Sequence, residues 1–267
     1  MIGSGVSANS VSSDGKRPPT WGEFLRVAKE RMPQNKQYIS SALKRYAYLE
    51  ACAYLRDELG QQAWGDLIRE YFVHTNYEPA TIHEYIFELD LRTIISLNFD
   101  SIYEKYVYAK TQETLVIKNY FDGEIRQTIA GKDRYVIKAH GTADTVSKLI
   151  FTLEDYGSAR VKHASFYELM TALLHTHVFL FVGCGTSDPD LQILFEDYRY
   201  KLEEAPHYMT VPKPFNAASA KLLERTRGLN TLSYSPRDHH SELTVALGEL
   251  KQLVIEERTA LAVSQNW

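Results

Sequence analysis

The sequence predicts an α/β fold with a mainly parallel sheet and helices on both faces. Short runs rich in β-branched residues alternate with helical stretches after residue 90, which is the pattern of βαβ units. One of these runs, Arg92–Leu97 (R-T-I-I-S-L), is short and β-branched, as a buried strand should be. With 267 residues, 44% of them hydrophobic, the chain is long enough to bury one large core.

Residues 21–90 are predicted to be helical throughout, because apolar side chains such as Leu43, Ala47, Ala51 and Tyr54 recur at helical spacing. After the strand Arg92–Leu97, the pattern predicts a helix from Ser101 and a hairpin over Leu115–Ile129. Further strands are predicted at Arg134–Ala139, Lys148–Phe151, His177–Val182, His207–Val211 and Leu229–Ser233. Further helices are predicted over Phe166–Thr176 and Pro189–Glu203, near Ala217–Thr226, and from about His240 to Arg258. We therefore expect a single domain over residues 1–258, with a helical insertion at 22–90 and a tail at 259–267.

Composition excludes several classes of protein. A net charge of −4 gives no general affinity for nucleic acid or membranes, and no apolar run approaches the length of a membrane span. The two cysteines, Cys52 and Cys184, cannot supply the four ligands of a structural zinc site. Few cysteines and no secretory segment fit a cytoplasmic protein. The 18 tyrosines predict either many half-buried positions or a surface that meets a partner.

The first candidate site is the turn Gly3-Ser4-Gly5-Val6-Ser7. A Gly-x-Gly turn lets backbone N–H groups approach a pyrophosphate, and the serines add hydroxyl donors. The alternative is a Gly-Ser linker, since only Met1 and Ile2 precede the turn. A nucleotide-binding turn here therefore requires a very short strand.

Two further candidates follow predicted strands. Asn98 and Asp100 come directly after Arg92–Leu97, where ligands bind in open α/β sheets; the alternative is a helix cap, with Ser101 and Glu104 at capping-box spacing. His140, followed by glycine, ends the next such strand and could act as a general base. Its alternative is an ordinary polar residue that is satisfied by neighbours.

The fourth candidate is a second Gly-x-Gly turn that joins a strand to a helix. Gly183 and Gly185 form the turn, and the hydroxyls of Thr186 and Ser187 follow it at the helix start. Asp188 is predicted to cap this helix, with Pro189 in its first position. The alternative is a plain strand–turn–helix connection without a ligand.

These motifs, taken in order, resemble the sirtuin-like family, specifically the sirtuin-like domains of bacterial antiphage defence systems. Gly3–Ser7 looks like the family's G-A-G-[IV]-S turn, and Asn98-Phe99-Asp100 is similar to its T-N-x-D motif. His140-Gly141 resembles its H-G pair, and the segment from Gly183 resembles its late G-[ST]-S loop. Residues 151–156 (F-T-L-E-D-Y) and 187–191 (S-D-P-D-L) look like two segments of the defence branch.

The resemblance implies a Rossmann-like NAD-binding fold and an NAD+ hydrolase that releases nicotinamide and ADP-ribose. NAD+ would be a substrate rather than a redox cofactor, and Asn98 and His140 would be the catalytic residues. The two glycine turns, with Ser4, Val6, Ser7, Gly185, Thr186 and Ser187, would hold the dinucleotide, and Asp100 would brace the loop. The resemblance also implies a homo-oligomer and the role of a defence effector, with a HerA-type ATPase or a short Argonaute as a candidate partner.

The sequence departs from the protein deacylases of this family. Residues 8–20 do not match their G-I-P-D-F-R-S loop, and their zinc-binding cysteines are missing. Gly185 stands where the late loop has serine, and Leu97 replaces a threonine. A deacylase is therefore disfavoured. A non-catalytic or nuclease-like subunit that binds a nucleotide or DNA stays open as the alternative to a hydrolase.

Overall fold

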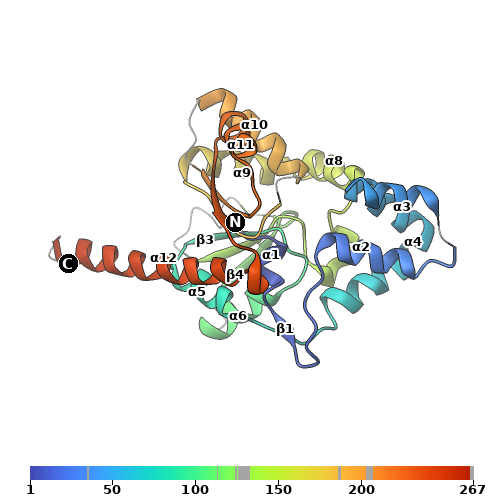
Figure 1. Ribbon diagram of the computed structural model, residues 1–267, viewed down its shortest axis with the longest axis horizontal. Helices are drawn as coiled ribbons and strands as arrows, with labels where there is room; N and C mark the ends of the chain where they lie inside the picture. The colour runs from blue at the N-terminus through green and yellow to red at the C-terminus, as the bar shows by residue number, and fades with distance from the viewer. Residues whose placement is uncertain are drawn as a thin grey trace.

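The computed structural model (Figure 1) describes residues 1–34, 36–112, 114–123, 125, 133–185, 188–202 and 207–264. Two three-stranded parallel sheets form its centre. One has the order β3-β5-β4, with β3 at Thr93–Ser96, β4 at Val116–Asn119 and β5 at Tyr135–Lys138. The other has the order β6-β7-β8, with β6 at Leu180–Phe181, β7 at His207–Pro212 and β8 at Leu229–Tyr234.

Ile2 joins the two sheets. It makes parallel bridges to Ser96, the last residue of β3, and to Val182, which follows β6. Its backbone N–H donates to the Ile95 carbonyl at 2.8 Å, and its own carbonyl accepts from Leu97 at 2.9 Å. The very short strand that the first turn requires is therefore present, and the chain turns away from it at the switch point between the two half-sheets, where open α/β sheets bind ligands.

Helices cover both faces of the sheet, which confirms the predicted fold class (Figure 1). In β3 and β5, Ile95 and Ile137 belong to one core, while Ile94 and Val136 belong to another, because successive side chains of a strand point to opposite faces. The first core is covered by α8 (Leu153–Lys162), α9 (Ala164–Thr176), α10 (Pro189–Leu202) and α11 (Ala217–Arg227). The second is covered by α5 (Thr81–Glu88), α6 (Ile102–Lys110) and α12 (Arg237–Ser264).

A third core lies to one side of the sheet (Figure 1). It is formed by α2 (Trp21–Glu30), α3 (Gln37–Lys44) and α4 (Tyr48–Phe72), here called the helical unit, together with the 3₁₀ helix η1 (Ala143–Lys148). The predicted insertion 22–90 is not helical throughout. Its strand β2 (Tyr77–Glu78) pairs with β1 (Val11–Ser12) in an antiparallel ribbon, and α5 packs on the sheet rather than on the helical unit.

Within the hairpin predicted over Leu115–Ile129, residues 116–119 do form a strand, β4, which pairs in parallel with β5. The predicted second arm falls on 126–129, which lie outside the described residues. Residues 148–151 are not a strand; Ile150 and Phe151 are buried in different cores, so a loop between two cores has the apolar composition of a strand. The last helix extends past Arg258 to Ser264. No helix among the described residues is long and apolar enough to cross a membrane.

Candidate active site

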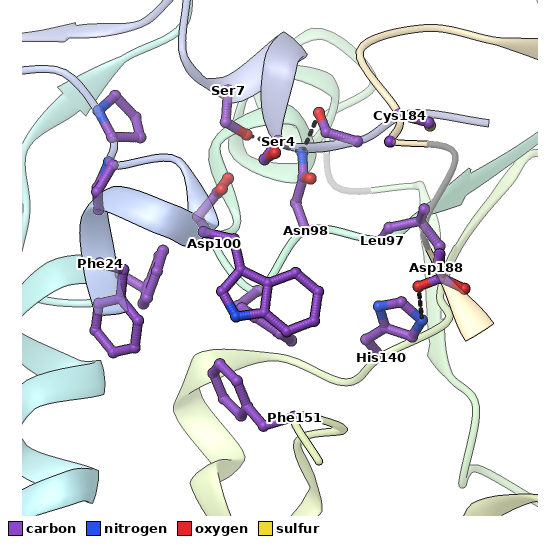
Figure 2. Close-up of a pocket in the computed structure, with 17 residues that line it drawn as sticks. Ser4, Ser7, Phe24, Leu97, Asn98, Asp100, His140, Phe151, Cys184 and Asp188 are labelled. Carbon is purple, nitrogen blue, oxygen red and sulfur yellow. Dashed lines mark hydrogen bonds and ion pairs between the residues drawn. The ribbon is translucent and has the colours of Figure 1, made fainter. Parts of the chain in front are cut away.

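One cavity opens at the carboxyl ends of β3 and β5, beside the Ile2 junction (Figure 2). It holds about 770 Å³ of empty space, its open mouth included. Its lining combines polar groups from the sheet edge with an apolar wall, and consists of Gly3, Ser4, Ser7, Pro18, Pro19, Trp21, Phe24, Phe72, Leu97, Asn98, Phe99, Asp100, His140, Phe151, Cys184, Gly185 and Asp188.

The two glycine turns pack back to back beneath this cavity. The Gly5 N–H donates to the Gly183 carbonyl at 3.0 Å. A Cβ atom on Gly3 would lie 2.6 Å from that same carbonyl oxygen, and one on Gly183, which has φ of +64°, would lie 2.6 Å from the Val6 nitrogen. Only glycine allows these backbones to approach so closely, so each turn fixes the position of the other.

Asn98 is tethered to the first turn. Its Nδ2 donates to the Gly3 carbonyl at 3.1 Å and to Ser7 Oγ at 2.9 Å (Figure 2). Because a carbonyl can only accept, the Gly3 bond fixes which end of the amide is Nδ2. Oδ1 is then buried and has no hydrogen-bond partner among the described residues. Such an atom calls for a water or ligand donor.

Asp100 lies in the loop just before α6 and binds the first residue of that helix. Its Oδ1 accepts from the Ile102 N–H at 3.1 Å, so the cap at this helix is Asp100 rather than Asn98. The predicted Ser101–Glu104 capping box is wrong, because Ser101 makes no side-chain cap bond and Glu104 is paired with the buried Lys138 at 2.8 Å. Burial raises the pKa of Glu104, and the Lys138 ammonium opposes that shift. Lys138 also donates to the Asp100 carbonyl at 2.5 Å, which holds the loop against β5.

His140 lies at the end of β5 and faces a carboxylate from the other half-sheet. Its Nε2 is 3.3 Å from Asp188 Oδ2 (Figure 2), and the same oxygen accepts from the Tyr156 hydroxyl at 2.9 Å. Asp188 Oδ1 accepts from the Leu191 N–H at 3.0 Å, which confirms the predicted cap of α10, with Pro189 as its first residue. Asp188 therefore both caps α10 and faces His140, and the sequence indicated only the cap.

The segment 151–156 contacts both the helical unit and Asp188. Thr152 and Asp155 form a capping box at the start of α8. Asp155 also accepts two bonds of 2.9 Å from Arg56 of the helical unit. Phe151, before the box, lines the cavity, and Tyr156, after it, reaches Asp188. The start of α8 thus connects the helical unit with the residue that faces His140.

The apolar wall of the cavity is the part that the sequence did not indicate. Its aromatic members come from the helical unit and from the two loops that border it, and they belong to the third core; they are Trp21, Phe24, Phe72, Phe99 and Phe151. Phe99 and Phe151 have ring centroids 4.3 Å apart, and Phe24 contacts Phe72 and Phe151. Their spacing in the sequence is that of ordinary core residues, so no local signal distinguishes them.

The structure brings most of the predicted site residues to one place. Those that line the cavity are Gly3, Ser4, Ser7, Asn98, Asp100, His140 and Gly185. Gly5, Val6 and Gly183 do not line it; Val6 is wholly buried in the second core, and the two glycines pack turn against turn. Thr186 and Ser187 lie outside the described residues.

Burial disfavours the thiolate form of both cysteines. Burial raises the pKa of Cys52 and of Cys184 to about 12, so both thiols stay protonated at neutral pH. Cys52 accepts a bond from the Trp21 indole at 3.3 Å. Within the ranges that the structure describes, no three His, Cys, Asp or Glu side chains are grouped to hold a metal ion.

Comparison with known proteins agrees with this geometry. Residues 92–232, somewhat more than half of the chain, match the SIR2-like domain family. The NAD(+) hydrolase ThsA of Enterococcus faecium is 32% identical over 139 residues, or 51% of this chain and 29% of that protein. The ThsA of Bacillus cereus is 24% identical over 133 residues, which cover 49% of this chain and 28% of the relative.

A third relative is matched over a longer stretch. Defense-associated sirtuin 2 of Bacillus subtilis is 22% identical over 221 residues, or 80% of this chain and 20% of that protein. The chain therefore spans less than a third of the length of each of these relatives. Gly3, Gly185, Asn98 and His140 line one cavity of an α/β fold, and the family match covers both Asn98 and His140: the chain belongs to the SIR2-like domain family.

Proposed function

We propose that this cavity binds NAD+ and cleaves its nicotinamide–ribose bond with water, giving nicotinamide and ADP-ribose. The observation that carries the proposal is the buried, unpaired Oδ1 of Asn98 in the same cavity as His140. A hydroxyl of a ribose, or the attacking water, is the donor that Oδ1 lacks. The names of the ThsA relatives, which are NAD(+) hydrolases, support the same substrate.

The first turn suits a dinucleotide. Gly3, Ser4 and Ser7 line the cavity where a backbone turn at a strand end receives a pyrophosphate in this class of fold. Gly185 is exposed and lines the same cavity, and it would border the adenosine ribose. The apolar wall offers the planar nicotinamide ring a dry surface.

The reaction is a substitution at the anomeric carbon of the nicotinamide ribose. The bond between the anomeric carbon and the pyridinium nitrogen breaks, and the electron pair leaves with nicotinamide, which becomes neutral. The ribose passes through an oxocarbenium-like state, and the oxygen of water forms the new bond to the anomeric carbon. His140 would accept the proton of the water or of a ribose hydroxyl, and Asn98 would orient the ribose. Positioning and exclusion of bulk water then supply most of the acceleration.

We propose further that the activity serves antiphage defence and is held low until the chain assembles. Support comes from the Bacillus subtilis relative, named a defence-associated sirtuin. Unrestrained loss of NAD+ would kill the cell that makes the enzyme. The exposed Tyr38 and Tyr46 of the helical unit are our candidates for contacts between protomers.

Incubation of the purified chain with NAD+, with chromatography of the products, tests the hydrolase. We expect equal amounts of nicotinamide and ADP-ribose, and loss of both in Asn98→Ala and His140→Ala. Asn76→Ala and His175→Ala change the same residue types at exposed positions and should keep the activity. The assay is run at rising protein concentration, so that an assembly requirement becomes visible.

Two results would count against the hydrolase. Turnover that survives both site variants would place the chemistry elsewhere. Saturable NAD+ binding, measured by calorimetry, with no product at any protein concentration would favour the non-catalytic nucleotide-binding subunit instead.

A further inference from the structure

Asp188 is a buried hydrogen-bond acceptor. It is 8% exposed, its Oδ1 accepts from the Leu191 N–H, and its Oδ2 accepts from the Tyr156 hydroxyl at 2.9 Å. A further neighbour of Oδ2 is His140 Nε2, at 3.3 Å. A carboxylate in this position favours a proton on the facing ring nitrogen, because an unprotonated Nε2 would set a lone pair against an anion.

The geometry points to a role for this pair that goes beyond helix capping and rests on the proposed function. We propose that Asp188 and Tyr156 are positioning residues that keep His140 in the Nε2–H tautomer. Nδ1, on the cavity side of the ring (Figure 2), is then the unprotonated nitrogen. It is the one that can accept a proton from a ribose hydroxyl or from water.

Two aromatic rings also lie next to the imidazole. Tyr156 meets His140 edge to face with centroids 5.4 Å apart, and Phe99 lies 6.5 Å away between centroids. Rotation of the imidazole that exchanged Nδ1 and Nε2 would break the approach to Asp188 within this packing. The tautomer and the orientation of His140 are thus fixed by the same neighbours.

Tyr156 owes its position to the start of α8. The Thr152–Asp155 capping box fixes the first turn of that helix, and Arg56 binds both carboxylate oxygens of Asp155. The Tyr156 side chain is wholly buried, and its hydroxyl has a buried acceptor in Asp188. A tyrosine that only filled the core would not need that acceptor, and phenylalanine would serve equally well.

The test separates positioning from capping. In Asp188→Asn, the side-chain carbonyl can still cap α10, since asparagine is a good N-cap, but the charge is lost and an amide N–H faces His140. Tyr156→Phe keeps the ring and removes only the hydroxyl. Both variants are examined in the full chain, with histidines labelled by ¹⁵N for NMR at a pH near 8, where an ordinary imidazole is neutral. His140→Ala assigns the His140 signals.

We expect the Nε2–H tautomer in the unchanged protein and a gain of Nδ1–H in Asp188→Asn. The kcat for NAD+ should fall in Asp188→Asn, by up to the roughly 10⁴-fold lost when a carboxylate that orients a catalytic histidine is neutralised. In Tyr156→Phe it should fall less, with KM little changed in either variant. Melting temperatures that stay within a few degrees would exclude unfolding as the cause.

Two outcomes would overturn the proposal. One is an unchanged protein with Nδ1–H at His140; the other is a tautomer that Asp188→Asn leaves unaltered. The NMR result does not depend on catalysis. If the tautomer shifts as expected but no preparation cleaves NAD+, the hydrolase fails while the positioning role stands.

Discussion

Replacement of Asn98 by alanine tests the centre of the site, and the hydrogen bonds of Asn98 allow the loss of folding stability to be worked out. The variant loses the two bonds from Nδ2, to the Gly3 carbonyl and to Ser7 Oγ. Asn98 is 6% exposed and Ser7 is 3% exposed, so water cannot readily replace the amide. A net hydrogen bond contributes about 0.5–1.5 kcal/mol, and a buried partner left unpaired costs about 1–3 kcal/mol. We expect the free energy of unfolding to fall by about 1–3 kcal/mol.

The loss of activity should be far larger than this instability accounts for. If Oδ1 orients the ribose, NAD+ cleavage should fall by about 10²-fold or more, since misplacement of the reacting groups has effects of this size. Urea denaturation gives the stability, and the initial rate of nicotinamide release gives the activity. Ile86→Val, in the second core and away from the cavity, should cost about 0.5–1.5 kcal/mol and serves as a destabilised control. Asn98→Ala with activity as high as that control would refute the catalytic role and leave Asn98 as a tether for the first turn.

Four further outcomes are expected. Gly183→Ala should lower the free energy of unfolding by about 2–4 kcal/mol, through its positive φ and the clash with Val6; Gly157→Ala, with open space around its Cβ, should leave stability equal or higher in the same denaturation assay. Burial lowers the pKa of His207 from 6.5 to about 4, so between these values the unfolded chain binds more protons and stability should fall as the pH falls. His207→Asn should weaken that dependence, and an unchanged pH profile would contradict the assignment. Elemental analysis should find no stoichiometric zinc in the purified protein. Light scattering under conditions of NAD+ cleavage should show an assembly larger than a monomer, and an active monomer would rule out control by assembly.

The sequence predicted the parallel sheet and the strand ends because both depend on local signals. Asn98 and His140 each follow a β-branched run, and parallel strands place their carboxyl ends at one edge. Asp188 was recognisable as a cap because a helix start has its own residue preferences. What periodicity could not supply is contact between distant segments. Asn98 reaches Gly3 instead of capping α6, and Glu104 pairs with Lys138 instead of closing a capping box.

The sequence did not predict the apolar wall, for a related reason. Trp21, Phe24 and Phe72 have the spacing of any helix core, and only the packing of the helical unit against Phe99 and Phe151 turns them toward a cavity. The segment 148–151 was wrongly predicted as a strand because its local pattern could not show which cores it contacts. An apolar run bounded by polar residues reads as a buried strand, whereas this one is a loop shared by two cores.

The place of Ile2 has a consequence for how the chain folds. The residue lies between two half-sheets whose strands come from the middle and the later part of the chain. Contacts between segments so distant in sequence form slowly, because a long loop must close before they are gained. Each half-sheet can assemble around its own helices, but the cavity needs Gly3 against Gly183. We therefore expect site formation to be a late folding event, governed by when the first few residues dock rather than by when the sheets form.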